Sequence, residues 1–545
     1  MIVERGRAEM VMVSWSHERT ARLTLATLAM AFMGCDSLTV RNVTEPDAEG
    51  VYGTASSIEQ TIATQFRNCH NARTQVWSQA TNLSLDGFNT LSVGQDLPRA
   101  SLPNAPGSQV TFFGDYSGFG TNSRTAANLL TALDRLLTRG GTLGSKAQNL
   151  RARAFGFFSL ACHLGHLALV YDSAAIVTPG LGSDSIPPFS GAAEVMRVAI
   201  EMLDTSIAVA SNPAASDNGG FPLPAGWING NALSRDDFVR LVRSLRGRFR
   251  AGVARTPDER ERVNWDAVID DARNGVSGDL MITTGTSTGW SRLGGNTNQP
   301  LPPMYYGMAD VSGAYDAWLA LPPSLRGVFL IQTPDRRFPQ GATRQAQQAS
   351  GSSAGASFVA TPYLINRTDE VTGQPWLVSH YQYRRVRYLT TAATVGPFPF
   401  VTRAEMDLLA AEGHLRRGDI AAAAALIDVS RVGRGQLPAL KGVITNLDQP
   451  VPGGANCVPR VPTASAFTST ACGNIWEAMK WEKRMETAIV NYAGWYVDGR
   501  GWGDLIEGTA LEFPVPYEEL AARHKPYYTY GGGLRSSAAR GTYGF

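Results

Sequence analysis

Residues 402–431 read TRAEMDLLAAEGHLRRGDIAAAAALIDVSR, and this stretch decides the fold. Thr402 followed three residues later by Glu405 is a capping box, the typical start of a helix. The turn at residues 417–419 interrupts that helix, and the alanine-rich residues 420–431 predict a second one. Two antiparallel helices with small residues at their contact are the unit of a tetratricopeptide-like stack. The repeat period of about 34 residues is not visible, so any such repeat is degenerate.

Helical patterns extend from this pair towards both ends of the chain. Ser234 and the run TPDE at residues 256–259 supply further N-terminal caps, the second with a proline at the first helical position. Apolar residues at helical spacing predict helices over 50–80, 121–139, 146–171, 194–209, the segment after Ser234, 257–275 and 475–491. The sequence therefore predicts a mainly all-α fold, built as a tetratricopeptide-like helix-pair stack.

The composition changes between about residues 276 and 400. Gly, Ser, Thr, Asn and Pro cluster at residues 283–303 and again at 341–362, with aromatic residues among them. Long loops of this kind inside a folded protein are usually binding surfaces or disordered segments. We therefore divide the chain into an N-terminal helical region, 49–280, and a C-terminal region, 281–545, that holds a loop-rich lobe and the closing helices.

The N-terminus has the pattern of an export signal. Arg19 and Arg22 precede the apolar run of residues 23–33, and Gly34 and Cys35 follow. The run is too short to span a bilayer, which needs about 20 apolar residues. A basic segment, a short apolar segment and a small residue before the cleavage point are typical of a signal peptide.

Gly34-Cys35 resembles a bacterial lipobox, in which the cysteine is acylated and becomes the mature N-terminus. Residues 1–34 are thus predicted to be a lipoprotein signal peptide and residues 35–48 a polar tether. Acyl chains on Cys35 would hold the protein at a membrane by burying methylene groups. Ordinary cleavage after residues 29–31 is the alternative, and it would leave a soluble secreted protein.

The five cysteines fit an exported chain. If Cys35 carries lipid, an even number remains to form disulfides in an oxidising compartment. Cys457 and Cys472 bracket a loop rich in Pro, Ser and Thr, and Cys69 with Cys162 would then be the second pair, although the sequence leaves the connectivity open. Bound metal is the rival interpretation, because a histidine follows Cys69 and another follows Cys162. Neither has the paired spacing of a structural zinc site, so no metal is predicted.

The charge balance argues against nucleic acid as a partner. The chain has 49 basic and 47 acidic residues, a formal charge of +2. So small an excess gives no strong field to attract nucleic acid or anionic lipid. No nucleic-acid partner and no cofactor are predicted.

Five short motifs follow one another in a fixed order along the chain. They are residues 149–155 with Leu160 and Gly165, 333–337, 403–405 with 411–413, 481–486 with 498–500 and 503–505, and 513–516 with 518–519. Together they resemble the motifs of the SusD/RagB family of nutrient-binding outer-membrane lipoproteins, which accompany TonB-dependent transporters. The match departs from the family at residues 165–168, which read GHLA instead of Gly-Asp-Val-Pro, and at Gly413.

The resemblance implies a SusD-like fold, in which helix pairs support a loop-rich second lobe that carries the ligand surface. It implies a non-enzymatic, surface-exposed outer-membrane lipoprotein whose cargo is a glycan, an oligosaccharide or a peptide. The implied partner is a TonB-dependent, SusC-like transporter that receives this cargo.

Candidate ligand residues come from local composition, because none of the motifs identifies a ligand contact. Sugar binding uses aromatic faces for the rings and planar polar groups for the hydroxyls. The candidates in the loop regions are Trp77, Asp86, Asn89, Trp290, Tyr305, Tyr306, Trp318 and Trp376. Trp290 and the Tyr305-Tyr306 pair lead, because Gly- and Pro-rich loops surround them. The competing interpretation is that these rings pack in the core or between lobes.

The charged residues of the five motifs are interpreted as structural, because charges repeated on helices usually form ion pairs or caps. They are Arg153, Glu405, Glu412, Glu482, Arg484, Arg500 and Asp504.

Two other classes of function remain as alternatives. A secreted glycoside hydrolase needs two carboxylates across a cleft, and Asp498, Asp504 and Glu512 are candidates among many. No GxSxG, HExxH or P-loop motif supports another enzyme class. The second alternative is a helical scaffold that binds another protein without a small ligand, but such a scaffold has no need of the loop-rich residues 283–400.

Overall fold

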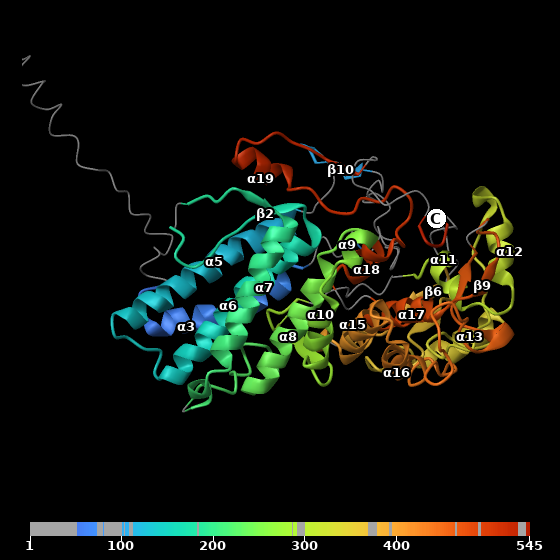
Figure 1. Ribbon diagram of the computed structural model, residues 1–545, viewed down its shortest axis with the longest axis horizontal. Coiled ribbons are helices and arrows are strands. Elements are labelled where there is room, and N and C mark those ends of the chain that lie inside the picture. The colour runs from blue at the N-terminus through green and yellow to red at the C-terminus, as the bar shows by residue number, and fades with distance from the viewer. Residues whose placement is uncertain are drawn as a thin grey trace, which may run out of the picture. The chain divides into compact units, whose positions relative to one another are not determined.

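Helix α6 (Lys146–Val170) is the central helix of the N-terminal half. Four helices pack against it, as Figure 1 shows. Every residue from Ala154 to Val170 is buried as a result. By length and composition α6 could cross a membrane, but this burial identifies it as the core helix of a folded unit. The four neighbours are α3 (Ala55–Asn71), α5 (Phe113–Thr138), α7 (Ala192–Ala210) and α8 (Arg235–Gly252).

The N-terminal caps that the sequence predicts at Ser234 and Thr256 are present in the structure. The side chain of Ser234 accepts a hydrogen bond from the backbone N–H of Asp237 at the start of α8, and Thr256 accepts one from Glu259 at the start of α9 (Pro257–Glu261). The single helix predicted over residues 257–275 is wrong. The structure divides it, because Asn264 caps a second helix, α10 (Trp265–Arg273).

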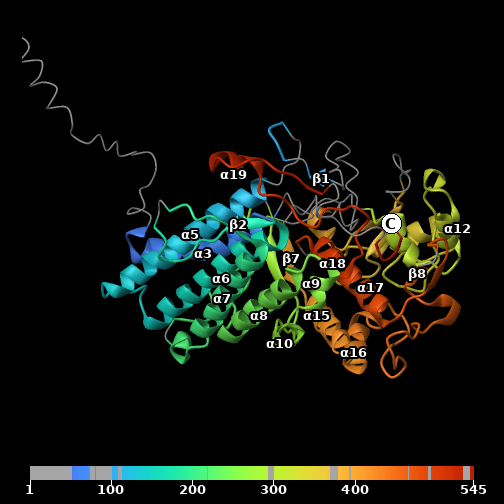
Figure 2. The same cartoon turned by 45° about the horizontal axis from the view of Figure 1, so that its top comes forward.

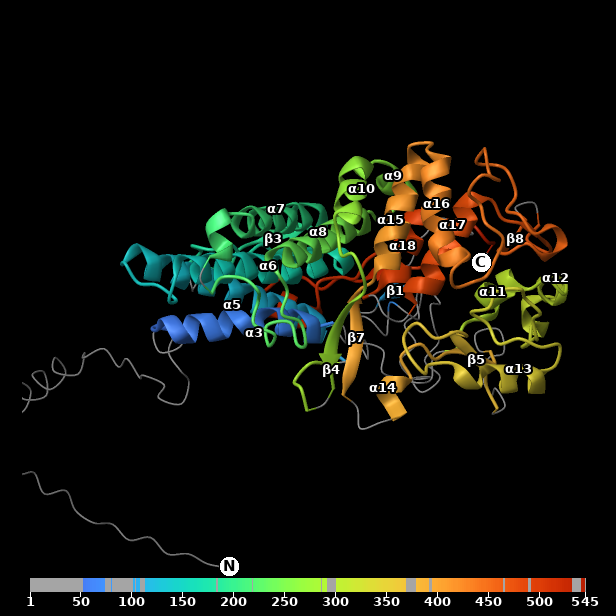
Figure 3. The same ribbon diagram turned by 90° about the horizontal axis from the view of Figure 1, so that it is seen from below.

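Short strands pair only two by two within the part of the chain that the structure describes. The longest pair joins β4 (Leu280–Thr284) to β7 (Gly396–Val401), and Figure 3 shows it beside the N-terminal helices. The remaining antiparallel pairs are β1 (Ser101–Leu102) with β10 (Tyr530–Gly531), β2 (Ser173–Ala175) with β3 (Phe189–Gly191), β5 (Leu364–Asn366) with β6 (Tyr381–Tyr383), and β8 (Arg460–Pro462) with β9 (Thr470–Cys472).

Short helices and turns fill the loop-rich region between β4 and β7. The α-helices are α11 (Pro303–Tyr306), α12 (Ala314–Ala320), α13 (Arg344–Ser350) and α14 (Tyr388–Thr391). The 3₁₀ turns of the chain are η1 (Pro213–Ser216), η2 (Gly307–Ala309), η3 (Pro323–Leu325), η4 (Gly351–Ser353) and η5 (Gly454–Asn456). The region is therefore folded, although no long helix forms there among the described residues.

The predicted helix pair of the C-terminal half is α15 (Arg403–Arg416) with α16 (Ile420–Arg431), and Thr402 caps α15 as expected. Helix α17 (Ile475–Thr487) packs against both. The sequence prediction extended α17 to residue 491, but the backbone leaves the helical conformation at Ala488. Two further helices were not predicted, α18 (Gly494–Trp502) and α19 (Tyr517–Ala522).

The C-terminal segment returns to the N-terminal helices. Figure 2 shows α19 beside β2 and α5. Arg523 donates to the carbonyl oxygen of Pro187 at 2.6 Å, and Asn104 donates to the carbonyl oxygen of Val515 at 2.8 Å. The described residues from Thr54 onward form one compact unit.

The structure is a computed structural model. It describes residues 52–73, 80, 101–102, 104–107, 113–182, 185–217, 219–285, 287–291, 300–368, 379–391, 395–463, 466–488, 492–531 and 541–544. The predicted signal peptide, Cys35 and the tether lie outside this part of the chain.

Buried ion pairs connect the N-terminal helices to the C-terminal ones. Arg248 on α8 pairs with Glu405 on α15 at 2.7 Å, and Arg260 on α9 pairs with Glu412 on α15, also at 2.7 Å. The structural interpretation of the motif charges is confirmed for these two glutamates, because both carboxylates lie in the interior and face arginines rather than solvent.

Candidate functional site

The leading aromatic candidate, Trp290, is a core residue. Only 4% of its surface is exposed. Its ring lies 5.9 Å from that of Phe66 and 5.5 Å from that of His70, both on α3. The structure contradicts the expectation that this ring is exposed on a loop surface.

Tyr305, Tyr306 and Trp318 are likewise buried, so the expectation of an exposed aromatic surface is wrong for them too. Tyr306 donates its hydroxyl to the carbonyl oxygen of Phe329 at 3.2 Å, and Trp318 donates its indole N–H to that of Gly327 at 2.8 Å. The physical reason is that short helices present no long aliphatic stripe. Aromatic rings with polar ends build the core of this region instead.

The other predicted contacts cannot be placed. Trp77, Asp86, Asn89 and Trp376 lie outside the described residues.

An open groove with a volume of about 570 Å³ lies between α3, α6 and the loop at residues 224–227. This volume falls within the range of small-ligand sites, about 300–1,000 Å³. Its main lining residues are Glu59, Gln60, Thr64 and Arg67 of α3, Gln148 and Arg151 of α6, and Pro224 and Trp227 of the loop. The α3 residues recur at intervals of about four, which places them along one face of that helix. This groove is the candidate functional site.

Arg151 is a fixed part of the groove wall. It donates to the carbonyl oxygens of Gly219 and Gly220, each at 2.9 Å, and pairs with the carboxylate of Glu59. Its guanidinium lies 4.8 Å from the centre of the Trp227 ring. These contacts position both side chains and leave little of the indole face open, so Trp227 contributes an apolar edge rather than a stacking platform.

Other polar groups of the groove are available to a ligand. Within the described ranges, no hydrogen bond or ion pair occupies the guanidinium of Arg67 or the side-chain amide of Gln148. Gln60 is exposed on the same face of α3. Amide, guanidinium and carboxylate groups on a rigid helical support can hold a hydroxyl-rich or peptide-like molecule by hydrogen bonds.

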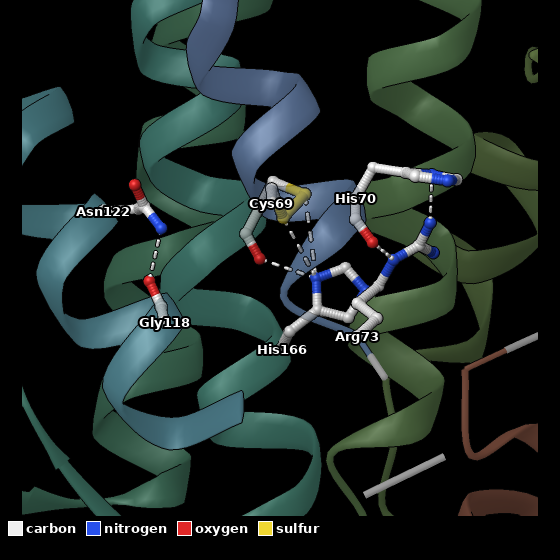
Figure 4. The surroundings of a disulfide bond; sticks show 7 residues. Cys69, His70, Arg73, Gly118, Asn122 and His166 are labelled. Carbon is white, nitrogen blue, oxygen red and sulfur yellow. Dashed lines mark hydrogen bonds between the residues drawn. A yellow bond between two sulfur atoms is a disulfide. The ribbon is translucent and has the colours of Figure 1, made fainter. Parts of the chain in front are cut away.

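A disulfide joins the two helices that form the groove. Cys69 on α3 is bonded to Cys162 on α6, and Cys457 is bonded to Cys472, which are the two pairs considered from the sequence. Figure 4 shows the first of these with the ring of His166 directed at it. Because this buried bridge links α3 directly to α6, it fixes the spacing of the two helices.

The surroundings of this disulfide do not provide a metal donor set. Nδ1 of His166 lies 3.7 Å from each sulfur, but it is 2.6 Å from the carbonyl oxygen of Cys162, to which it donates. Burial, with Arg73 as a second cause, lowers the pKa of His166 well below its usual range. The bonded sulfurs are not thiolates, the form of cysteine that binds metal.

The three carboxylates considered for glycoside hydrolysis do not face one another across a cleft. Asp498 pairs with Arg260 and Lys483, Asp504 pairs with Lys480 and Arg484, and Glu512 pairs with Arg255. All three are buried. Their ion pairs give them a structural role.

The groove residues were not among the candidates from the sequence, although one signal was present. Gln60, Thr64 and Arg67 form a polar stripe on α3 beside the apolar stripe of Ile58, Ile62 and Phe66. Such a stripe is usually a solvated face, and only the packing of α3 against α6 turns it into one wall of a groove.

Neither a protein-family model nor a curated protein matches the sequence. The structure is similar to that of surface glycan-binding protein A from Bacteroides uniformis, which is 12% identical, with 88% of this chain and 100% of that chain covered and a TM-score of 0.51. It is also similar to a SusD superfamily protein from Bacteroides thetaiotaomicron, again 12% identical, with 86% and 97% covered and a TM-score of 0.50.

The chain therefore has the SusD-like fold. The predicted fold class, mainly helical and SusD-like, is confirmed, and so is the resemblance to SusD/RagB proteins at the level of the fold.

Proposed function

We propose that this protein is a nutrient-binding lipoprotein of the SusD/RagB type on the outer surface of an outer membrane. It binds a glycan, an oligosaccharide or a peptide without chemical change and delivers it to a TonB-dependent transporter. The observation that carries the proposal is the SusD-like fold, which extends over most of the chain. One protein with this fold is named as a surface glycan-binding protein.

The groove between α3 and α6 supports a binding role. It is open, it has the volume of a small-ligand site, and its free polar groups lie on two helices held together by a disulfide. A site on rigid elements loses little conformational entropy when a ligand binds. Binding rather than catalysis also agrees with the buried ion pairs of Asp498, Asp504 and Glu512.

The export pattern at the N-terminus supports the location. Acylation of Cys35 would anchor the chain, and residues 35–48 would act as a tether between the membrane and the folded unit. Mass spectrometry of the N-terminal peptide from membrane-extracted protein tests this step. We expect an acylated Cys35, whereas release of the protein into the medium with an unmodified N-terminus would contradict it.

Two measurements on the full chain test the proposed function. Glycan and peptide arrays probed with purified protein should show binding, and the double variant Gln60→Ala, Gln148→Ala should bind more weakly with an unchanged melting temperature. Extraction of the native protein in mild detergent should co-purify a TonB-dependent barrel. Failure of both measurements would refute the proposal.

A second candidate function is a scaffold that binds another protein through its helix pair. Val429 on α16 is 58% exposed and Val432, just after it, is 43% exposed. Large apolar side chains that stay exposed close together can mark a protein contact. If Val429→Ser removes binding of a protein partner and the double variant Gln60→Ala, Gln148→Ala leaves that binding intact, the scaffold function is favoured.

A further inference from the structure

The charges of the groove do not balance. Three ionisable side chains line it, Glu59, Arg67 and Arg151. Glu59 and Arg151 form an ion pair with each other. Arg67 forms none among the described residues, so the groove carries one excess positive charge.

The excess charge lies at one end of the groove. Arg67 follows Glu59 by eight positions on α3, which corresponds to about 12 Å along a helix axis. Arg67 is partly buried, and the planar fork of N–H donors of its guanidinium matches a carboxylate or a sulfate group. At the other end, Glu59 and Arg151 neutralise each other, so no excess positive charge is left there for a second anion.

Neutral hydrogen-bonding groups lie between these two ends. Thr64 on α3 and Gln148 on α6 line the groove together with Gln60. The two amide groups both donate and accept, and the Thr64 hydroxyl, which donates to the carbonyl oxygen of Thr61 at 2.9 Å, can accept from a sugar hydroxyl. Extended peptides, in contrast, are commonly held by a free strand edge, and helix side chains form these two walls.

We propose, on the basis of the proposed function, that the groove selects an oligosaccharide that carries a single anionic substituent. The anion, a uronate carboxylate or a sulfate ester, pairs with Arg67. The neutral sugar units extend along α3 towards Glu59 and bind Gln60, Thr64 and Gln148. An oligosaccharide with an anion on every unit binds less well than the singly charged form, because its further anions lose their hydration in the groove and find no unpaired cation there.

A matched set of glycans tests this inference. Arrays should carry several backbones, each in a neutral form, a form with one uronate, a form with one sulfate and a form charged on every unit. Titration calorimetry with the full chain then measures the best backbone in solution. We expect about tenfold tighter binding of a singly charged form than of the neutral form, the usual effect of a charge-assisted hydrogen bond at a partly exposed site. The difference should shrink as salt is added.

Two arginine variants show whether Arg67 causes the difference in affinity between charged and neutral glycans. Arg67→Gln should remove the preference for the charged form and leave the affinity for the neutral form within about twofold. Arg139→Gln changes an exposed arginine just after α5 that does not line the groove, and it should leave the preference unchanged.

The outcomes distinguish the proposed anionic oligosaccharide cargo from the proposed nutrient-binding function. Equal affinity for neutral and charged forms, or a preference that survives Arg67→Gln, overturns the anionic cargo and leaves nutrient binding intact. Binding of acidic peptides alone, dependent on Arg67, overturns the oligosaccharide. No binding to any glycan or peptide defeats the proposed function itself.

Discussion

The substitution Glu412→Gln tests whether the motif charges hold the two halves of the fold together. Nε of Arg260 donates to one carboxylate oxygen of Glu412 at 2.9 Å, and a terminal nitrogen donates to the other at 2.7 Å. Both side chains have no exposed surface. Arg416 adds a further ion pair to Glu412 at 3.2 Å. Glutamine keeps the shape of the side chain and removes its charge.

Two lines of reasoning give the magnitude. Removing one partner of a buried ion pair costs about 3–5 kcal/mol, because the other charge stays buried without compensation. Burial alone would raise the pKa of Glu412, but the charge and hydrogen bonds of Arg260 overcome burial and lower it from 4.5 to about 2. That difference corresponds to about 3 kcal/mol of unfolding free energy. The two estimates agree.

The pH dependence has a definite sign. Because the pKa of Glu412 is lower in the folded state, its contribution is complete above the unfolded value of 4.5 and is lost as the pH falls towards about 2. The stability gap between the wild type and Glu412→Gln should therefore narrow below about pH 4.5.

Urea unfolding followed by tryptophan fluorescence measures this gap. Glu201→Gln is the matched control, because Glu201 pairs with Arg197 on the exposed face of α7 and should lose no more than about 0.5 kcal/mol. Equal losses in the two variants, or a gap that stays constant as the pH falls, would refute the reasoning.

Three further predictions concern the helices and rings around the groove. Replacing both Cys69 and Cys162 by serine opens a loop of 93 residues and should cost about 4–5 kcal/mol of unfolding free energy in urea; a loss below about 1 kcal/mol would show that helix packing alone holds α3 to α6. Gly165→Ala places a methyl group where the Phe249 ring lies, so it should destabilise by about 1–3 kcal/mol, and an unchanged melting temperature would contradict the close contact of α6 with α8. Trp290→Ala should cost about 3–5 kcal/mol, because the ring is part of the core. Lost ligand affinity at unchanged stability would instead make Trp290 a ligand contact.

Local signals predicted the helices well. Thr402 and Ser234 cap their helices as expected, and α16 has the predicted limits, because caps and apolar spacing are properties of adjacent residues. The break at Asn264 was missed, because the cap at Thr256 and the apolar face that begins at Trp265 were read as one helix, whereas Asn264 accepts from the backbone N–H of Ala267 and caps a second one.

The candidate site depends on long-range packing, which a single sequence does not reveal. Glycine- and proline-rich surroundings made Tyr305 and Tyr306 look like loop residues, yet the chain folds over them. Arg67 and Gln148 are 81 positions apart and come together only because α3 packs against α6. A polar stripe on a helix is a common feature, so its sequence could not distinguish a groove wall from a solvated face.

The most direct test of the central claim is a crystal structure of the full chain with the oligosaccharide that binds most tightly on the array. We expect sugar density between α3 and α6, with an anionic group within hydrogen-bond distance of Arg67 and sugar hydroxyls within hydrogen-bond distance of Gln148. Sugar bound elsewhere, for example against Tyr305 after a rearrangement of its loop, would contradict it.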